Sequence, residues 1–289
     1  MNRTIEIHSW GGFGSQLFAL ALILDLEARL QGTFSLICHS SGVTKRLPEI
    51  DSFLNRYKVI SIDDFQSSES GEVVKHKLAK RKKVVDFRKL ALFSGLIAEC
   101  NTDSQFAQIR PWIRQFRGHY SYRTITPKTL HSMNKVLVPT SPFTLLTSTY
   151  NPSTLSLHYR LGDLQSLSNK TYIESQRINS IIDHSIRENS IQTLLLSSDS
   201  PSEATQKIDF LNSESYELIQ LQGDSLALIS QLQSSQIFIG TNSKISLWVA
   251  IIRATFPRED YVTWMPFEMR SHLEANLYIA LSSGRINYY

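Results

Sequence analysis

Residues 224–255 read DSLALISQLQSSQIFIGTNSKISLWVAIIRAT, and this stretch decides the fold class. It contains a run of helical character (224–233), a short apolar run that ends in glycine (236–240) and a second helical run (243–255). We predict a helix, a buried strand and a helix, because buried strands are short and apolar whereas helices are longer. The same rhythm continues on both sides of the stretch.

The C-terminal half alternates between strand-like and helix-like segments throughout. Strands are predicted at 154–160, 193–198, 216–221, 236–240 and 261–264. Further helices are predicted at 172–189 and 201–212. Short apolar strands that alternate with helices imply βαβ units and a parallel sheet, and right-handed crossovers make such a sheet doubly wound.

The N-terminal half begins in the same way. Strands are predicted at 4–9, 34–39 and 58–62, with a helix from about residue 15 to residue 30. We therefore predict an α/β protein of two units, an N-terminal domain at 1–150 and a C-terminal domain at 151–289. The boundary falls in the Pro-, Ser- and Thr-rich stretch 136–154, and the alternative is one continuous sheet.

The composition is that of a globular protein. Hydrophobic residues make up 42% of the chain and charged residues 19%. No apolar run reaches the length of a membrane span, and MNRTIEIHSW lacks the pattern of a signal peptide. We therefore expect a cytoplasmic protein in which Cys38 and Cys100 are buried thiols rather than a disulfide.

The basic residues are concentrated in one run. Residues 75–90, KHKLAKRKKVVDFRKL, hold eight Lys and Arg against one acid, Asp86, although the net charge of the whole chain is only +4. The run suits contact with an anionic surface, such as the cytoplasmic face of a membrane. The alternative is a solvated helix face or loop. A nucleic-acid partner is not expected, because no zinc spacing, basic zipper or basic stripe with stacking aromatics is present.

Polar residues follow three of the predicted C-terminal strands. They are His158, Arg160, Gly162 and Asp163 after the apolar run 154–157, Ser197 to Ser200 after the run 193–196, and Gly240 to Ser243 after the run 236–239. In an open parallel sheet, ligands bind beyond the carboxyl ends of the strands. Three polar ends together therefore predict a crevice for a polar ligand.

The residue types favour a phosphate-bearing ligand. The planar guanidinium of Arg160 can hold two phosphate oxygens. Asn242 and Ser243 open a helix whose N–H groups and dipole attract anions. The alternatives are an ion pair between Arg160 and Asp163 that only pins the loop, and ordinary capping by Asn242 and Ser243.

Several enzyme classes are disfavoured by the motifs that are missing. No histidine pair or acidic triplet has metal-ligand spacing, so no metal and no cofactor is expected. There is no Walker GxxxxGK[ST]. The GGFGSQ loop lacks the third glycine of the dinucleotide fingerprint, and FSLICHSSG supplies no ribose-binding acid. There is also no G-x-S-x-G elbow of a hydrolase.

Five segments match one known family in order. GGFGSQLF resembles the GGLGNQLF opening of the α-1,2-fucosyltransferases of glycosyltransferase family eleven, and HYRLGD resembles that family's HxRRGD segment. LLLSSD is similar to its Ser-Asp strand end, and TNSKISLW to its NSSFSWW segment. RGHYSYRTI is also similar to that family's mid-chain Gly-Tyr-x-Gln-Ser stretch. Leu161 stands where the family has a second arginine, and Lys244 where it has a second serine.

The resemblance implies a GT-B-like fold, with two Rossmann-like domains whose parallel sheets face each other across a cleft. It implies metal-independent, inverting transfer of fucose from GDP-fucose to a hydroxyl of a glycan or lipid-linked glycan, in surface-polysaccharide or O-antigen assembly. The N-terminal domain would face the acceptor, and the C-terminal domain would bind the donor. The catalytic residues implied are Arg160, Asp163 and His158. Donor contacts are expected from Ser198, Asp199, Asn242, Ser243 and Ser246.

The glycine loop HSWGGFGSQLF at 8–18 belongs to the N-terminal domain. We interpret Gly11, Gly12 and Gly14 as making room where donor and acceptor meet, with Gln16 as the side chain that contacts the ligand. The alternative is a tight strand-to-helix turn. For the whole chain, the alternatives are a transferase with a different nucleotide- or phosphate-activated sugar donor and a non-catalytic nucleotide- or glycan-binding module.

Overall fold

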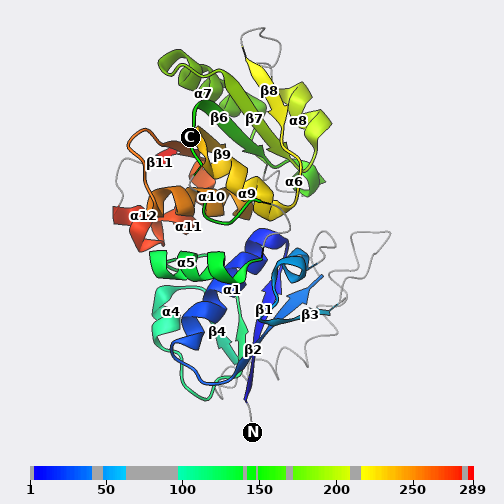
Figure 1. The fold of residues 1–289 in the computed structure, drawn as a ribbon, viewed down its shortest axis with the longest axis vertical. Helices are drawn as coiled ribbons and strands as arrows, with labels where there is room; N and C mark the ends of the chain where they lie inside the picture. Colours follow the sequence, from blue (N-terminus) through cyan, green and yellow to red (C-terminus); the bar gives the residue numbers. More distant parts are fainter. Residues whose placement is uncertain are drawn as a thin grey trace. The chain divides into compact units, whose positions relative to one another are not determined.

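The computed structural model describes residues 3–40, 48–62, 97–138, 142–147, 149–166, 172–208, 216–281 and 286–289. The chain divides into two compact units, Met1–Arg123 and Thr124–Tyr289, called here the N-terminal and C-terminal units (Figure 1). The basic run 75–90 lies outside the described residues.

The N-terminal unit is built on a parallel sheet. Its five described strands lie in the order β3-β2-β1-β5-β4, and every neighbouring pair is parallel. The strands are β1 (Thr4–Trp10), β2 (Thr33–His39), β3 (Lys58–Ile62), β4 (Ile97–Glu99) and β5 (Gln115–Arg117). The helical segments are α1 (Phe13–Glu27), η1 (Glu49–Phe53) and α4 (Asp103–Ala107).

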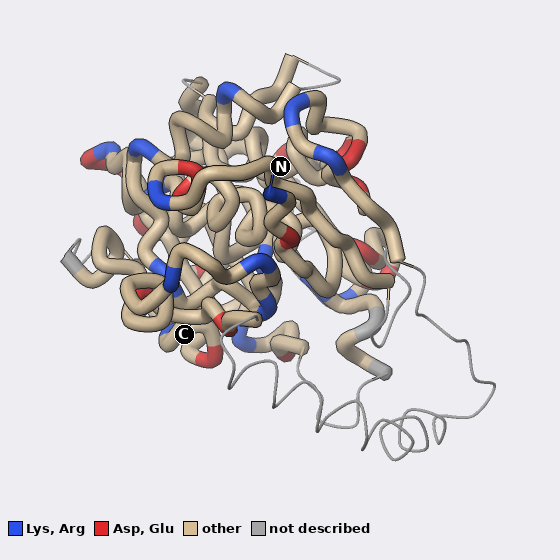
Figure 2. The backbone as a smooth tube through the Cα atoms, turned by 90° about the horizontal axis from the view of Figure 1, so that it is seen from below, with Lys and Arg blue, Asp and Glu red and all other residues tan. Residues whose placement is uncertain are grey.

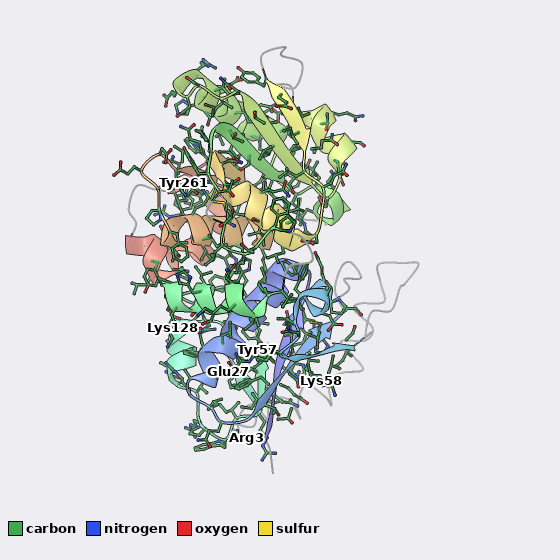
Figure 3. The ribbon with its side chains drawn as sticks, in the orientation of Figure 1. Arg3, Glu27, Tyr57, Lys58, Lys128 and Tyr261 are labelled. Carbon is green, nitrogen blue, oxygen red and sulfur yellow. The ribbon has the colours of Figure 1, made fainter. Side chains whose placement is uncertain are left out.

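Helix α1 is apolar on nearly all sides, and most of its residues are buried. A helix that is hydrophobic all round belongs in a core rather than on a surface. Its C-terminal end is tied to the segment before β3, because Glu27 (Figure 3) pairs with Arg56 at 3.0 Å. The predicted strand–helix–strand beginning of the chain is confirmed.

The C-terminal unit contains a second parallel sheet. Within the described ranges it has six strands in the order β11-β10-β9-β6-β7-β8. The strands are β6 (Asn151–Tyr159), β7 (Thr193–Ser198), β8 (Glu217–Gln220), β9 (Ser235–Gly240), β10 (Val262–Met265) and β11 (Ile286–Tyr288). The helical segments are α5 (Pro127–Val136), α6 (Gly162–Ser166), α7 (Ser175–Glu188), α8 (Pro201–Lys207), α9 (Ser225–Gln233), α10 (Lys244–Thr255), η3 (Phe267–Met269), α11 (Arg270–Glu274) and α12 (Leu277–Leu281).

Strand β6 shows that helices cover both faces of this sheet (Figure 1). Leu155, Leu157 and Tyr159 pack in one core cluster with isoleucines of α7 and with Ala204 of α8. Ser156 points to the other face, where its hydroxyl donates to a carbonyl of α9 at 3.0 Å. Alternate residues of β6 therefore face opposite sides of the sheet, and helices cover each side. The sheet is doubly wound, as predicted.

The two parallel α/β units confirm the predicted fold class, but the division between them differs from the expected one. The boundary predicted after residue 150 lies inside the C-terminal unit. Part of the Pro-, Ser- and Thr-rich stretch is packed into the C-terminal unit and does not form a linker between two domains. Leu145 is buried, and its carbonyl accepts a hydrogen bond from Gln233 of α9. Helix α8 ends at Lys207, whereas the sequence predicted a helix to residue 212; residues 209–215 lie outside the described residues.

The described helices and charged residues have two further features. Among the helices in the described ranges, none combines the length and the apolar character needed to cross a membrane. Figure 2 shows the basic and acidic residues of the described chain interspersed along its length.

Candidate functional site

The candidate site lies where the strand order of the C-terminal sheet reverses. From β6 the chain proceeds to β7 and β8 on one side, and then returns to β9, β10 and β11 on the other. Ligands of doubly wound sheets bind at the carboxyl ends of the strands beside such a switch point. Arg160 follows β6, Asp199 follows β7 and Asn242 follows β9. The structure thus brings the three predicted segments to one sheet edge.

Thr241 joins the ends of β6 and β9. Its hydroxyl donates to the carbonyl of His158 at 2.8 Å and accepts the backbone N–H of Arg160 at 3.0 Å. Its own N–H donates to the hydroxyl of the buried Ser246 at 3.0 Å. Because two of these bonds hold the backbone that leads into Arg160 and the third reaches the first turn of α10, Thr241 sets the path of both loops.

The Arg160 loop is also held by Asp199. One carboxylate oxygen of Asp199 accepts the N–H of Leu161 at 2.9 Å, and the other lies 3.5 Å from Nε of Arg160. A Cβ on Gly162 would overlap the Asp199 carboxylate, so a larger residue there would displace that carboxylate from the Arg160 loop. The described partner of Arg160 is thus Asp199. Asp163, the partner considered from the sequence, lies in α6, and its side chain is outside what the structure describes.

His158 bridges two strand ends from a buried position. Its Nδ1 lies 3.1 Å from the Ser197 hydroxyl at the end of β7, and its Nε2 lies 3.1 Å from the Ser243 hydroxyl after β9. Burial, and secondarily the charge of Arg160, lowers the pKa of His158 to about 4, so the ring is neutral at pH 7. Both ring nitrogens are engaged within the protein, which gives His158 a structural role; a contact with the donor stays a prediction.

The N-terminus of α10 is a favourable place for an anion. Ser243 caps it by accepting the N–H of Ile245 at 3.2 Å, and Asn242 precedes it in a half-buried position. Lys244 is the first helical residue, and burial lowers its pKa to about 8. A partly buried cation at the positive end of a helix is electrostatically unfavourable unless an anion is close. The edge therefore has the charge pattern of an anion site.

Two further predicted donor contacts have local roles. The hydroxyl of Ser198 accepts the N–H of Ser200 at 3.0 Å and shapes the turn into α8. Ser246 is fully buried beneath Thr241. Both residues lie at the predicted edge, but the bonds described for them serve the loops themselves. A direct ligand contact by either stays a prediction.

The glycine loop of the N-terminal unit is a tight strand-to-helix turn. Gly11 has φ +100°, and a Cβ there would lie 2.9 Å from the Ser15 hydroxyl. Gly12 caps α1, and Gly14 is buried in its first turn. Gln16 is only 1% exposed: its amide donates to the carbonyl of Gly11 at 3.2 Å, and its oxygen accepts the N–H of Ile50 at 3.0 Å. The amide of Gln16 thus holds this loop to η1, whereas the sequence suggested a ligand contact.

Three residues that shape the site were missed or undervalued at the sequence level. Thr241 lies within the segment after β9, but nothing local distinguishes it from its polar neighbours. Leu161 is fully buried in the core cluster of β6, which explains why a charged side chain does not occupy this position. Lys244 was noted only as a difference from the resembling family. Its position as the first residue of a helix is the signal that could have identified it.

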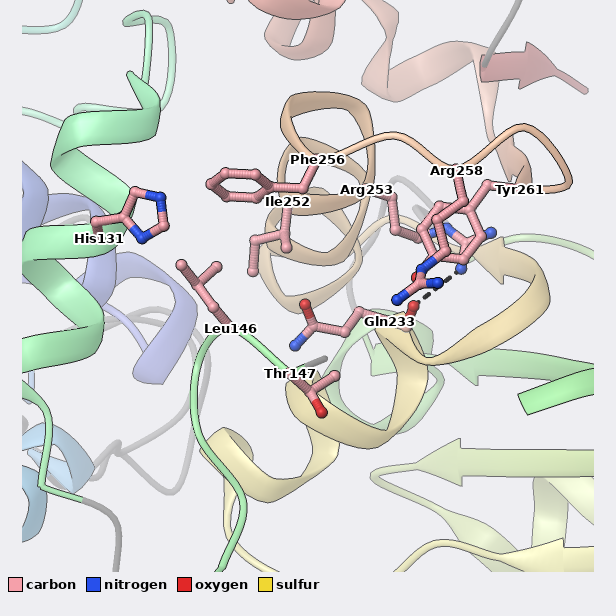
Figure 4. A pocket seen from close by; sticks show the side chains of 9 residues that line it. All are labelled: His131, Leu146, Thr147, Gln233, Ile252, Arg253, Phe256, Arg258 and Tyr261. Atoms are coloured by element: carbon pink, nitrogen blue, oxygen red, sulfur yellow. Dashed lines mark hydrogen bonds between the residues drawn. The ribbon is translucent and has the colours of Figure 1, made fainter. Parts of the chain in front are cut away.

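A separate pocket of about 310 Å³ lies at the opposite, amino-terminal edge of the sheet (Figure 4). Its charged wall contains Arg253, whose guanidinium stacks on Tyr261 at 3.8 Å and donates to four backbone carbonyls and to Thr263. None of the predicted site residues lines this pocket. Arg253 therefore ties strand ends together, and the pocket is distinct from the candidate site.

Within the part of the chain that the structure describes, no group of three or more His, Cys, Asp or Glu side chains is arranged to hold a metal ion.

No protein-family model matches the chain, and no curated protein sequence matches it. Among solved structures, the chain is similar to E. coli heptosyltransferase WaaC with ADP-2-deoxy-2-fluoro heptose, at 11% identity and a TM-score of 0.45, over 91% of this chain and 88% of that one.

Two further solved structures are similar at the same level. One is the co-structure of S. aureus MnaA with UDP, at 11% identity and a TM-score of 0.47, over 99% of this chain and 84% of that one. The other is NodZ α-1,6-fucosyltransferase soaked with GDP-fucose, at 12% identity and a TM-score of 0.42, over 87% and 93%. Because identity is this low, the residues at the sheet edge must carry the functional argument.

Proposed function

We propose that this protein is an inverting glycosyltransferase that moves a sugar from a nucleotide-sugar donor to a hydroxyl of a glycan acceptor, without a metal. One observation carries the proposal: Arg160, Lys244 and the N-terminus of α10 all belong to the carboxyl edge of the C-terminal sheet, at its switch point. A cationic edge of this kind suits the diphosphate of a nucleotide sugar.

The chemistry asks for negative charge to be stabilised as it develops. In the transfer, the bond between the sugar carbon and the diphosphate oxygen breaks, and the electron pair stays on the departing nucleotide diphosphate. A new bond forms between that carbon and the acceptor oxygen, which loses its proton. Preorganised donors are worth most where the charge appears, and one of them can contribute a factor of about 10²–10³ in rate. Arg160, fixed by Thr241 and Asp199, is such a donor.

The finer assignment is GDP-fucose as donor, with transfer in surface-polysaccharide or O-antigen assembly at a cytoplasmic location. It rests on the resemblance of HYRLGD and TNSKISLW to the family-eleven segments. A different sugar nucleotide is the second candidate, and the buried Leu161 favours it, because the second cation of the family's site is replaced by an apolar core residue.

The proposal is tested by nucleotide binding and by turnover. We expect GDP to raise the melting temperature of the protein more than UDP, CDP or dTDP, and GDP-fucose to be consumed in the presence of glycan acceptors. Arg160→Ala should abolish both effects, while Arg187→Ala, which removes an exposed arginine of α7, should change neither.

Each contrary outcome has a different meaning. Near-normal turnover by Arg160→Ala would overturn the role of Arg160. Stabilisation by UDP but not by GDP would remove the fucose assignment and keep the transferase. Tight nucleotide binding with no transfer to any acceptor would instead establish a non-catalytic binding module.

A further inference from the structure

The pocket at the amino-terminal edge of the C-terminal sheet is a second place in this unit where a ligand can bind. All of its described lining residues belong to the C-terminal unit. Its volume of about 310 Å³ is at the lower end of the range of about 300–1,000 Å³ that is usual for small-molecule sites. Because the pocket shares none of its lining with the donor edge, whatever binds here is a second ligand.

The walls of the pocket include two aromatic rings that neighbouring side chains hold in place. The ring of His131 meets Phe256 edge-on, with centroids 5.2 Å apart. The guanidinium of Arg253 stacks on Tyr261 at 3.8 Å, and the buried Ile252 completes this apolar wall. Aromatic rings with fixed planes favour a flat, apolar ligand, because such a ligand packs offset or edge-to-face against them.

Gln233 places one polar atom inside the pocket. This residue is 4% exposed, and its amide nitrogen donates to the carbonyl of Leu145 at 2.8 Å. Because a carbonyl only accepts, this bond fixes which end of the amide is the nitrogen. The other end is the oxygen, and no described residue donates to it. Figure 4 shows the amide of Gln233 directed towards Leu146 and Ile252.

The oxygen of Gln233 sets a requirement for the ligand. A molecule that fills the pocket displaces the water around this oxygen. A purely apolar molecule would leave the oxygen buried without a donor, which is unfavourable. A ligand that fits the pocket therefore carries a hydrogen-bond donor, such as a hydroxyl, at its inner end.

The charge at the mouth of the pocket is positive. His131 and Arg258 are the exposed residues of the described lining, and they mark where the pocket opens to solvent. Both charged residues of that lining are arginines, and Arg253 is already engaged by backbone carbonyls. Asp260, in the same loop as Arg258, is outside the lining and accepts the hydroxyl of Tyr150. A guanidinium at the mouth suits a carboxylate, which it can bind through two parallel hydrogen bonds.

We propose that this pocket binds a small aromatic hydroxy acid. The ring of the ligand packs against Phe256 and Ile252, its hydroxyl donates to Oε1 of Gln233, and its carboxylate pairs with Arg258. The inference does not rest on the proposed function, because the pocket and the donor edge lie at opposite ends of the strands and share no residue.

Binding is tested by titration calorimetry with para-hydroxybenzoate, para-hydroxyphenylacetate and para-hydroxyphenylpropionate, which differ in the length between ring and carboxylate. We expect at least one of these probes to bind with a Kd below about 1 mM. The same probe without its hydroxyl should bind about tenfold more weakly, because the oxygen of Gln233 then loses its donor. The proposal is overturned if no probe binds or if removal of the hydroxyl makes no difference.

A variant of the protein tests the place of the carboxylate. Arg258→Met should weaken binding of the hydroxy acid about tenfold, because the charged hydrogen bonds to the carboxylate are lost. Binding of para-cresol, which has the hydroxyl but no carboxylate, should stay the same. Arg187→Met removes an exposed arginine of α7 outside the pocket and is the matched control, which should bind the acid like the wild type. Equal binding of the acid by Arg258→Met and the wild type would overturn the proposal.

Carbon-13 NMR of methyl groups locates the probe in the unaltered protein. We expect the methyl signals of Leu146 and Ile252 to shift during the titration, and GDP not to displace the probe. Displacement by GDP, or shifts confined to methyl groups at the donor edge such as those of Leu161, would assign the probe to that edge and overturn the proposal. Failure of the proposed function is recognised separately, since it shows as absent nucleotide binding and absent transfer.

Discussion

The hydroxyl of Thr241 donates a hydrogen bond of 2.8 Å to the carbonyl of His158, and this bond ties the end of β9 to the end of β6. The same hydroxyl accepts the N–H of Arg160 at 3.0 Å. The backbone that presents the arginine is therefore set by one fully buried side chain from the neighbouring strand end.

Thr241→Val tests this arrangement with almost no change of shape. The variant leaves the Arg160 N–H and the His158 carbonyl without their partner, which costs about 1–3 kcal/mol for a buried group. Urea unfolding measures the loss, and nucleotide affinity should fall with it. Thr241→Ser keeps the hydroxyl and should stay closer to the wild type. Equal stability of the valine variant and the wild type would show that the bond is unimportant.

A second prediction concerns Gly162 and Asp199. A Cβ at residue 162 would overlap the Asp199 carboxylate, so Gly162→Ala should destabilise the protein by about 1–3 kcal/mol. If the overlap is the cause, the same substitution should cost less when Asp199 is already alanine. A double-mutant cycle measures that coupling, expected at about 0.5–3 kcal/mol. Additive effects would place the strain elsewhere.

Much of the fold could be predicted because its signals are local. Each longer strand, such as 193–198, is a short apolar run between polar turns, and the helices between strands are marked by their length and pattern. The strands β4, β5 and β11 have three residues each, which is too short for any period to show. Their existence depends on the neighbouring strand that pairs with them.

The site could be predicted in outline only. Parallel topology places strand ends at one edge, so His158, Asp199 and Asn242 could be grouped from sequence. Which side chains bond each other depends on register, which aligns His158 with Ser197 on one side and with Gly240 on the other. The pairing of Arg160 with Asp199 follows from that register and has no local signal.

A third prediction follows from the lowered pKa of His158. The ring takes up a proton near pH 6.5 when unfolded but only near pH 4 when folded, so the unfolded state binds more protons between these values. The stability that comes from keeping this ring neutral is complete above pH 6.5 and is lost as the pH falls towards 4. Between pH 7 and pH 5, the titration of His158 lowers the free energy of unfolding by about 2 kcal/mol.

His158→Gln removes the titration and keeps a polar side chain. The free energy of unfolding of this variant, measured in urea at pH 7 and pH 5, should change less between the two pH values than that of the wild type. His8 also has a lowered pKa and contributes in the same direction, so some pH dependence should remain. An unchanged difference in the variant would mean that His158 is not the titrating group.

The last prediction concerns Arg253 at the opposite edge of the C-terminal sheet. This side chain is 3% exposed, and its guanidinium donates to carbonyls of Gln233, Ser235, Gln236 and Val262. Arg253→Met puts an apolar side chain beside these four carbonyls and leaves them without a donor. The free energy of unfolding in urea should therefore fall by at least about 3 kcal/mol.

Arg258→Met is the matched control, because Arg258 lines the same pocket but is exposed (Figure 4). Its substitution should change stability by no more than about 0.5 kcal/mol. Equal losses from the two variants would assign the effect to charge in the pocket. A large loss confined to Arg253→Met would assign the effect to the buried arginine and its bonds to the strand ends, since Arg258 lies in the same pocket but is exposed.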